Sequence, residues 1–426
     1  MKKVISSLQW MIFILMGSIV IPIAVASSFN LNQVDTMNFV SRTLLVLGIG
    51  GILQALLGHR LPIQEGPAGV WWGVFTLYAG IGPIMFGSST ETLRVLSFSF
   101  ILSGLIFILF SVLGLVGKIA KLFTPTVMGI YLILLVVQLS GTFISSLVGI
   151  TSEHPTINFK TLILSLITIA VAFICMNIKS LKMYSTLISV VFGWTLFKLF
   201  NLAPSLAEVD KLFQLPSFFA FGTPKIEGSM IASTFFLTLL LLTNLLASVR
   251  AVELTFKKMG LEPDDRIKQA SFNSGIIHIL GGLFNSIPAV PISGSAAFIE
   301  QTNDTKREPF IIGNALIILI SLSPILTSFF AALPTAVGYA ALVPTFGFGT
   351  VAIGMEQIKH GAATSKKANF TIAVSWFVGI GLMFLPKTAF EGLPPLFTSI
   401  FSNGLIVGTI IAIVLDQLDQ KNNKKA

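Results

Sequence analysis

The sequence predicts an all-α polytopic membrane protein in which fourteen transmembrane segments form two inverted repeats of seven. Three observations lead to this fold class: the composition, the length of the apolar runs, and two pairs of matching motifs rich in proline and glycine. The chain has 426 residues, of which 54% are hydrophobic and only 11% are charged. A soluble chain of this length needs a larger charged surface than these residues can supply.

Apolar runs recur from Trp10 to Leu415, and many reach the roughly 20 residues that a helix needs to cross a bilayer. The first run imitates a secretory signal, but we expect it to stay as the first segment. Cys175 is the only cysteine and lies in an apolar run, which excludes disulfides and cysteine-based metal sites. We place transmembrane segments at residues 7–28, 36–57, 61–81, 93–116, 123–148, 160–177, 183–201, 230–254, 268–285, 287–303, 309–331, 334–355, 368–386 and 393–415.

The basic residues are distributed unevenly between the loops. With the N-terminus in the cytoplasm, most of the 27 lysines and arginines fall in inner loops or tails, and only Lys211, Lys225 and Lys387 fall in outer loops. Cytoplasmic loops of membrane proteins carry this excess of positive charge. The net charge of +9 therefore gives no reason to expect a nucleic-acid partner. We expect a multi-pass protein of a bacterial plasma membrane with both termini in the cytoplasm.

Two motif pairs indicate an internal repeat. Residues 62–69 resemble residues 291–297 with one gap, and residues 125–129 resemble residues 334–338. The members of each pair are seven segments apart, and because seven is odd the two halves have opposite orientations. The predicted units are a first repeat over residues 1–201, an extracellular linker over 202–229, a second repeat over 230–416 and a cytoplasmic tail over 417–426.

Segments three and ten are the ones that the first motif pair opens. Proline removes a backbone donor, and glycine permits conformations that other residues avoid. Each segment is therefore predicted to begin extended and to become helical only partway across the membrane. Two half-helices would then aim free N–H groups at one polar site near the membrane centre. The simpler alternative is that these residues only kink packed helices.

These motifs make the chain similar to the nucleobase–cation symporter-2 family, also called nucleobase–ascorbate transporters, which includes bacterial uracil and xanthine permeases. The resemblance implies a core domain that holds the substrate, a gate domain that moves against it, and short strands in segments three and ten. It implies a secondary active transporter, not an enzyme, that imports a nucleobase with a proton or Na⁺, needs no cofactor and forms a homodimer. The similar stretches are 7–10, 61–71, 123–125, 257–258, 281–288 and 291–302.

The chain departs from the family's polar pattern at several positions. Uracil and xanthine permeases usually carry a glutamate in the middle of segment eight, where Asn244 aligns. A second acidic or amide residue usually begins the segment-ten helix, where this chain has Gly294 and Ser295. The histidine that is common in segment one is replaced by Trp10. These changes leave both the cargo and the coupling ion open.

The candidate residues for substrate binding lie at the two breaks and in segment eight. An extended chain from Leu61, at about 3.3 Å per residue, puts Glu65 near the membrane centre, where it would bind the ligand or take the proton. The alternative is that the strand starts nearer the surface and Glu65 pairs with Arg60 or the cytoplasmic loops. The amide of Asn244 suits the alternating edge of a purine or pyrimidine, or an interhelical hydrogen bond. The predicted substrate-binding residues are Glu65, Gly69, Val70, Asn244, Gly294 and Ser295.

The remaining polar and aromatic residues are weaker candidates. His278 is the second candidate for proton coupling beside Glu65, and a hydrogen bond to a neighbour is the alternative. Trp71 or Trp72 would stack on a flat ring or only fill space. Arg250 and Glu253 lie one helical turn apart, where local charge compensation is the default interpretation. No metal-ligand spacing, phosphate-binding glycine loop or catalytic triad appears in the sequence.

The expected cargo is a nucleobase, with a weak preference for a purine such as xanthine over uracil. Two facing helix N-termini without fixed acids would also suit an anion carrier of similar fold, of the sulfate or carboxylate type. A channel or receptor that transports nothing is the alternative from another class. The repeated broken helices favour a carrier over this last interpretation.

Overall fold

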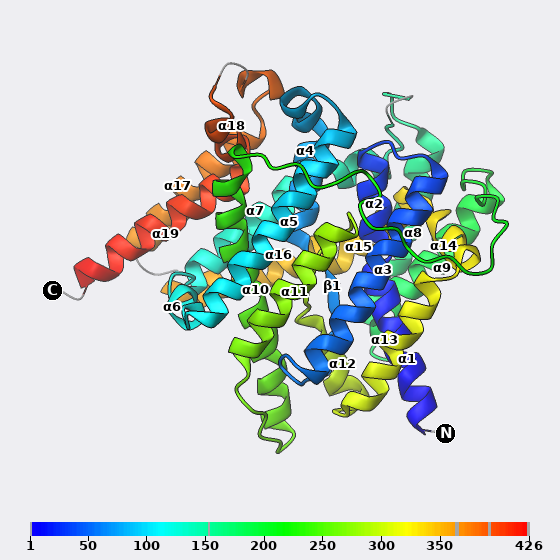
Figure 1. Ribbon diagram of the computed structural model, residues 1–426, viewed down its shortest axis with the longest axis horizontal. Coiled ribbons are helices and arrows are strands. Elements are labelled where there is room, and N and C mark those ends of the chain that lie inside the picture. The colour runs from blue at the N-terminus through cyan, green and yellow to red at the C-terminus, as the bar shows by residue number, and fades with distance from the viewer. Residues whose placement is uncertain (1, 152–153, 363–365, 391–392, 424–426) are drawn as a thin grey trace.

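The computed structural model describes residues 2–151, 154–362, 366–390 and 393–423 (Figure 1). The first half of the chain contains α1 (Lys2–Ser18), α2 (Val20–Ser28), α3 (Gln33–Leu56), β1 (Glu65–Pro67), α4 (Gly69–Phe86), α5 (Ser89–Val112), α6 (Val116–Ala120), α7 (Pro125–Leu147), α8 (Phe159–Asn177), η1 (Lys182–Tyr184) and α9 (Ser185–Leu199). The second half contains α10 (Ser229–Lys258), α11 (Ile267–Leu283), β2 (Ala289–Pro291), α12 (Gly294–Thr302), α13 (Arg307–Ser321), α14 (Pro324–Ala331), α15 (Thr335–Leu342), the π-helix η2 (Val343–Gly349), α16 (Thr350–Ala362), α17 (Lys366–Met383), η3 (Lys387–Phe390), α18 (Pro395–Phe401) and α19 (Gly404–Asn423).

Each predicted segment coincides with a helix or with an interrupted helix, and the strands lie in segments three and ten as predicted. Four interruptions were not predicted: segment one is divided between α1 and α2, segment eleven bends by 87° between α13 and α14, segment twelve contains η2, and segment fourteen is divided between α18 and α19. The last helix also continues through most of the predicted tail, to Asn423. Within the described residues, eight helices are long and apolar enough to cross a membrane, or nine if the bent pair is one span. The number of fourteen crossings therefore stays a prediction.

Side-chain caps mark several of the places where the chain turns into a helix. The side chains of Asn32, Ser88 and Thr124 accept hydrogen bonds from backbone N–H groups in the first turns of α3, α5 and α7. Pro125 follows its cap directly, where its missing N–H costs nothing. In the sequence, Asn, Ser or Thr before a helical segment is the usual signal for such a start.

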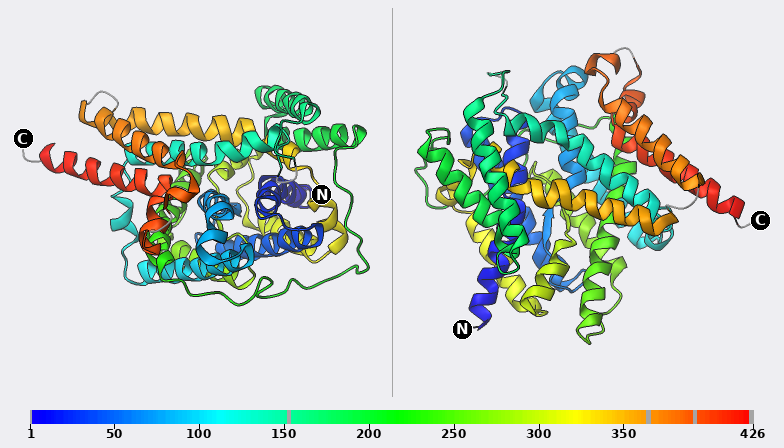
Figure 2. Two further views of the ribbon diagram at one scale, coloured as in Figure 1. Left: turned by 90° about the horizontal axis from the view of Figure 1, so that it is seen from above. Right: turned by 180° about the vertical axis from the view of Figure 1, so that it is seen from behind.

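The helices form two groups that lie in separate layers, which are clearest in the view from above (Figure 2). We call α1–α5 and α10–α14 the core group, because α5 packs on α11 and α13 packs on both α1 and α3. We call α7–α9 and α15–α19 the gate group, in which α7 packs on α16 and α17 packs on α19. Each group combines helices from both halves of the chain. The first half alone therefore cannot form either layer.

Glycines allow a very close helix contact within the core group. A Cβ built on Gly275 of α11 would lie 2.6 Å from the carbonyl oxygen of Gly104 on α5, and the reciprocal distance is 2.5 Å. Real Cβ atoms do not come this close to backbone. Small residues let two membrane helices approach until their backbones touch, and here they hold α5 against α11.

The linker between the halves crosses one end of the core group as an extended chain and is attached to it along its length (Figure 2). Its backbone N–H groups donate at Gln214 to the Leu322 carbonyl (3.0 Å) and at Phe219 to the Leu283 carbonyl (2.9 Å). Near its end, the Lys225 ammonium pairs with Glu91 at 2.9 Å. The linker is thus a fixed part of the core surface.

Basic residues that the sequence places in the cytoplasm gather at the opposite end. Lys3 pairs with Glu308 at 2.7 Å, Arg266 donates to the Gly58 carbonyl at 2.8 Å, and Arg307 donates to the Ala55 carbonyl at 3.4 Å. The loops predicted to be inner therefore share one end of the molecule. Which end faces the cytoplasm remains a prediction.

We predict that Gly275→Val lowers the unfolding midpoint of the purified protein by several degrees, because the new side chain must push α5 and α11 apart at a cost of about 1–3 kcal/mol. Gly141→Val on α7 is the matched control, since a Cβ there meets nothing within 4 Å. Thermal unfolding in detergent measures both. Equal midpoints for the two variants would contradict the packing account.

Candidate functional site

The two broken segments meet as a small antiparallel sheet inside the core group. Glu65 pairs with Pro291, Gly66 with Val290 and Pro67 with Ala289. Beyond the strands, the N–H of Ile292 donates to the Gln64 carbonyl (2.9 Å) and the N–H of Ala68 donates to the Pro288 carbonyl (3.1 Å). The strands are buried throughout. Each strand supplies the hydrogen-bond partners that the other needs away from water.

The structure corrects the register of the first motif match. The sequence aligns Pro62 with Pro291, whereas the strands end at Pro67 and Pro291 and are followed by helices that begin at Gly69 and Gly294. Pro67 is therefore the counterpart of Pro291. The match failed because both stretches repeat proline, so the first proline of one was aligned with the last strand residue of the other. The second match holds: α7 begins at Pro125, and α15 begins directly after Pro334.

Both half-helices begin without a side-chain cap, which leaves backbone donors free. The residues before them, Ala68 and Ser293, make no capping hydrogen bond from their side chains. Among the hydrogen bonds of the described residues, none is donated by the N–H of Gly69, Val70 or Gly294. These are three of the predicted substrate-binding positions. The partial positive charge of the two helix starts is therefore available to a ligand.

Ser295 is engaged in holding the site together. Its hydroxyl oxygen accepts the N–H of Gln64 at 2.9 Å, and its own N–H donates to the Ile292 carbonyl at 3.1 Å. The residue is fully buried. Its hydroxyl therefore joins the start of α12 to the chain before β1. The hydroxyl hydrogen is the part of Ser295 left for a ligand.

Gln64 is a site residue that sequence reasoning did not single out. Its side-chain amide donates to the Ile14 carbonyl (3.3 Å) and to the Ser18 hydroxyl (3.1 Å), at the break between α1 and α2. The amide thus ties β1 to the first segment. A polar side chain beside Glu65 in an apolar chain was the available signal.

Glu65 is completely buried, and its partner is His59. The distance from His59 Nε2 to Glu65 Oε1 is 3.7 Å, and neither carboxylate oxygen has a hydrogen bond to any described residue. The Nδ1 atom of His59 accepts the N–H of Leu61 at 3.0 Å, which assigns the proton of the neutral ring to Nε2, facing Glu65. Arg60 instead donates to the Leu56 carbonyl at 3.2 Å. Of the predicted alternative partners, Arg60 is therefore not the one that faces Glu65, whereas His59 of the same predicted inner loop is.

Asn244 lies at the free edge of β2, where its amide nitrogen donates to the Pro291 carbonyl at 3.3 Å. It is half-buried. One amide hydrogen and the amide oxygen stay available to another partner. The structure thus places Asn244 at the end of β2, three residues before the start of α12.

The other predicted residues are held apart from these groups. The ring of His278 bonds to the Ser274 carbonyl through Nδ1 at 2.8 Å and lies against Phe107 and Trp71, with ring centres 4.9 and 6.3 Å away. No contact between His278 and Glu65 is recorded among the described residues. Arg250 pairs with Glu253 at 2.6 Å, as the default interpretation expects, and with Asp265 at 2.9 Å. The hydrogen bond to Arg250 holds the pKa of the Asp265 carboxyl below its usual value.

The gate group closes over the start of α4. A methyl group at Gly69 would lie 3.6 Å from Leu135 and 3.8 Å from Phe346, which is ordinary contact distance. One turn further, the side chain of Gln138 on α7 donates to the Gly73 carbonyl at 2.9 Å. Trp72 is packed among the gate-group rings of Phe143, Tyr339 and Phe346, with centres 5.3 to 5.8 Å from its own. Packing is therefore the role that the structure gives to Trp72.

A small cavity opens between the groups on the other side of the strands. It has a volume of about 80 Å³ and is lined by Gln9, Phe13, Gly17, Tyr184 and Phe298 among others. A Cβ at Gly17 would lie 2.8 Å from Gln64 Nε2, so this wall adjoins the strand pair. Ligand pockets typically measure roughly 300–1,000 Å³. This cavity is therefore smaller than a typical ligand pocket.

Comparison with known proteins assigns the family. The model of the xanthine/uracil permease family, described as "Permease family", matches residues 1–388. The "Putative purine permease YwdJ" of Bacillus subtilis is 42% identical, over 100% of this chain and 98% of that protein. The "Nucleobase transporter PlUacP" of Paenibacillus larvae is 25% identical, over 96% and 92%.

A solved structure supports the fold. The transmembrane domain of a cyanobacterial bicarbonate transporter, BicA, has a TM-score of 0.60 at 13% identity, over 97% of each chain. At this identity the likeness concerns the fold alone, and it confirms the predicted fold class. The chain belongs to the xanthine/uracil permease family, that is, to the nucleobase–cation symporter-2 family, and is a multi-pass membrane transporter rather than an enzyme.

Proposed function

We propose that this permease imports a purine nucleobase such as xanthine, together with a proton, by movement of the core group against the gate group. The observation that carries the proposal is the pairing of the two broken segments, each followed by an uncapped helix start, with Asn244 bonded to the end of β2. The name of the 42% identical relative adds support for a purine. The rival cargo is an inorganic anion, which the same helix starts would also attract.

The donors and acceptors at the strand pair suit the edge of a purine. The free N–H groups of Gly69, Val70 and Gly294 can donate to ring carbonyl oxygens. The amide of Asn244 adds an acceptor and a donor. An anion could accept hydrogen bonds from the N–H groups but could donate none to the Asn244 amide oxygen. A cargo that uses both kinds of group therefore carries ring N–H as well as C=O.

Glu65 with His59 is the proposed proton site. An ionised carboxylate without hydrogen bonds is costly to bury, and a charged partner reduces the cost only at close range. At 3.7 Å the His59 ring is close enough to interact electrostatically with Glu65, but it makes no hydrogen bond to the carboxylate oxygens. Proton uptake at Glu65 would therefore depend on how the strand and the loop around His59 are positioned. His278 is left as the weaker candidate.

Ligand binding tests the cargo. We predict that xanthine raises the unfolding midpoint of the purified protein in a saturable manner, because a ligand that binds only the folded state stabilises it. Sulfate and bicarbonate at constant ionic strength are expected to leave the midpoint unchanged. A shift with either anion and none with xanthine, uric acid or uracil would overturn the nucleobase proposal.

Asn244→Ala is predicted to weaken xanthine binding about ten- to a hundredfold, because loss of one or two hydrogen bonds to a buried polar ring costs about 1.5–3 kcal/mol. Asn273→Ala is the matched control, since that buried amide on α11 bonds to the Gln269 carbonyl away from the strands. Titration of the midpoint shift gives both affinities. Unchanged affinity in Asn244→Ala would remove Asn244 from the site.

Glu65→Gln is predicted to separate binding from coupling. The amide has the same shape but cannot take up a proton, so exchange of labelled xanthine across proteoliposomes should continue while accumulation driven by a proton gradient is lost. Glu253→Gln is the control, because Glu253 is a buried carboxylate with an arginine partner. If Glu65→Gln accumulates xanthine as the unchanged protein does, Glu65 is not the proton site.

A further inference from the structure

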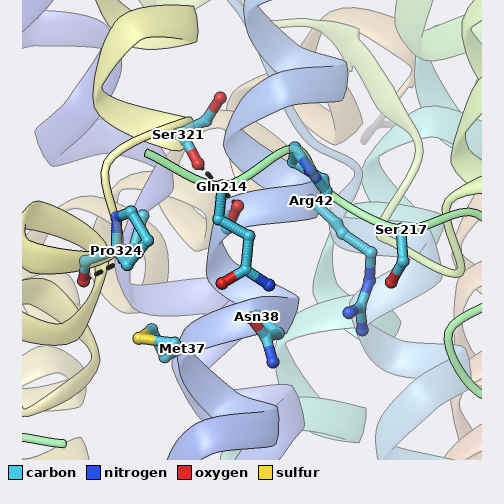
Figure 3. Close-up of a pocket in the computed structure, with 10 residues that line it drawn as sticks. Met37, Asn38, Arg42, Gln214, Ser217, Ser321 and Pro324 are labelled. Carbon is cyan, nitrogen blue, oxygen red and sulfur yellow. Dashed lines mark hydrogen bonds between the residues drawn. The ribbon is translucent and has the colours of Figure 1, made fainter. Parts of the chain in front are cut away.

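A buried arginine, Arg42 of α3, lies under the linker between the two halves of the chain. Arg42 on α3 is 3% exposed, and its Nε and Nη2 atoms have no hydrogen-bond partner. Within the described residues it forms no ion pair with any carboxylate. Figure 3 shows its side chain in the space between α3 and the linker. An arginine is charged at any physiological pH, and an unpaired buried charge is strongly unfavourable.

The neighbours of Arg42 cover its flat faces but leave its N–H groups unused. The guanidinium carbon lies 5.0 Å from the ring centre of Phe221, on the linker, and 5.8 Å from that of Phe39. Such stacking involves the face of the guanidinium, whereas its five N–H donors point outward in the plane. Asp35, two turns earlier on α3, is instead bonded to Asn32 at 2.8 Å. Within the described residues the charge of Asp35 acts on Arg42 from a distance, but no carboxylate is in direct contact with the guanidinium.

The cavity beside Arg42 is small and carries further donors. It has a volume of about 20 Å³, and its lining includes Asn38, Gln214 and Ser217, whose side chains make no hydrogen bond within the described part of the chain. The side chains of Asn38 and Gln214 turn toward the same space as Arg42 (Figure 3). The hydroxyl of Ser41 is already used, since it donates to the Ser321 carbonyl at 2.6 Å. A space of about 10–15 Å³ holds one water, so this cavity holds one small species.

We propose that Arg42, with Asn38 and the linker residues Gln214 and Ser217, binds a single small inorganic anion of the size of chloride. Each of these side chains has N–H or O–H groups to donate, and an anion also neutralises the buried charge, which a water molecule cannot do. The anion would join α3 of the first half to the linker that leads into the second half. The site shares none of its lining residues with the proposed nucleobase site, and its volume suits a chloride-sized ion better than a nucleobase or a sugar acid.

The dependence of stability on chloride tests the site. At constant ionic strength, replacement of gluconate by chloride is predicted to raise the unfolding midpoint of the unchanged protein by about 2 °C or more, with saturation. Arg42→Gln removes the charge and should show no response to chloride. Arg94→Gln is the matched control, because Arg94 lies at the same end but pairs with Glu91 at 2.5 Å; it should keep the full response.

Three results would overturn the proposal: no chloride response in the unchanged protein, the same saturable response in Arg42→Gln, or loss of the response in Arg94→Gln. Because Arg42→Gln could fail to fold, a second measurement uses the unchanged protein alone. Crystals grown in bromide should give an anomalous peak within hydrogen-bond distance of the Arg42 guanidinium. Absence of that peak at saturating bromide counts against the site. Neither measurement includes a nucleobase, so failure here leaves the proposed transport function untouched.

Discussion

Extended backbone inside a membrane protein must find its hydrogen-bond partners in protein, because lipid offers none, and in this chain β1 and β2 are each other's partners. The two strands come from opposite halves of the chain. Neither break could therefore be buried in its own half, and the two repeats depend on one another at the centre of the core group. Both strands end in a proline, which lacks an N–H, and the pairing continues for one hydrogen bond past each of them, from Ala68 and Ile292, before the chain becomes helical. The helices that follow begin within three residues of these prolines, with their donors free.

The two faces of the chain at the start of β1 carry different polar side chains. Successive residues of a strand point to opposite faces, so Gln64 and Glu65 cannot share a side. Gln64 reaches α1 and adjoins the cavity between the groups, while Glu65 meets His59 behind the strand. In the proposed cycle the cargo and the proton therefore occupy different faces of one strand. The strand itself would couple them, because any shift of its backbone moves both side chains.

How far the sequence predicted this arrangement can be argued from particular residues. The breaks, the strands and the positions of Gly69 and Gly294 followed from proline and glycine, which act on the local backbone and so are visible locally. The partners of Glu65, Gln64 and Arg42 were not predicted, because each depends on which distant side chains the fold brings within a few ångströms. The aligned prolines misled for the same reason: a motif fixes composition, whereas hydrogen bonds between strands fix register.

The unpredicted breaks in the helices of segments one and eleven were missed because their local signals were weak or outweighed. Segment eleven bends at Ser323–Pro324, a cap and an N1 proline in the middle of an apolar run. The run was long enough to be taken as one span, and length outweighed the local signal. The break between α1 and α2 has no comparable signal at its ends, although Pro22 lies in the first turn of α2. Near this break, the Ile14 carbonyl and the Ser18 hydroxyl accept hydrogen bonds from the Gln64 side chain.

The contact between the core and gate groups differs between the two sides of the strand pair, and this asymmetry bears on transport. Beyond Gly69, toward the linker end, Trp72 is enclosed by three gate-group rings and Gln138 bonds to the Gly73 carbonyl. Toward the end that carries Lys3 and Arg266, the cavity lined by Gln9 and Tyr184 separates the groups. With the orientation predicted from the basic residues, the structure is closed on the outside and partly open on the inside.

The outer contact consists of apolar rings and one hydrogen bond, and apolar surfaces without directional bonds can slide and repack at low cost. The proposed movement would therefore begin at this contact, with the strand pair carried along as one unit.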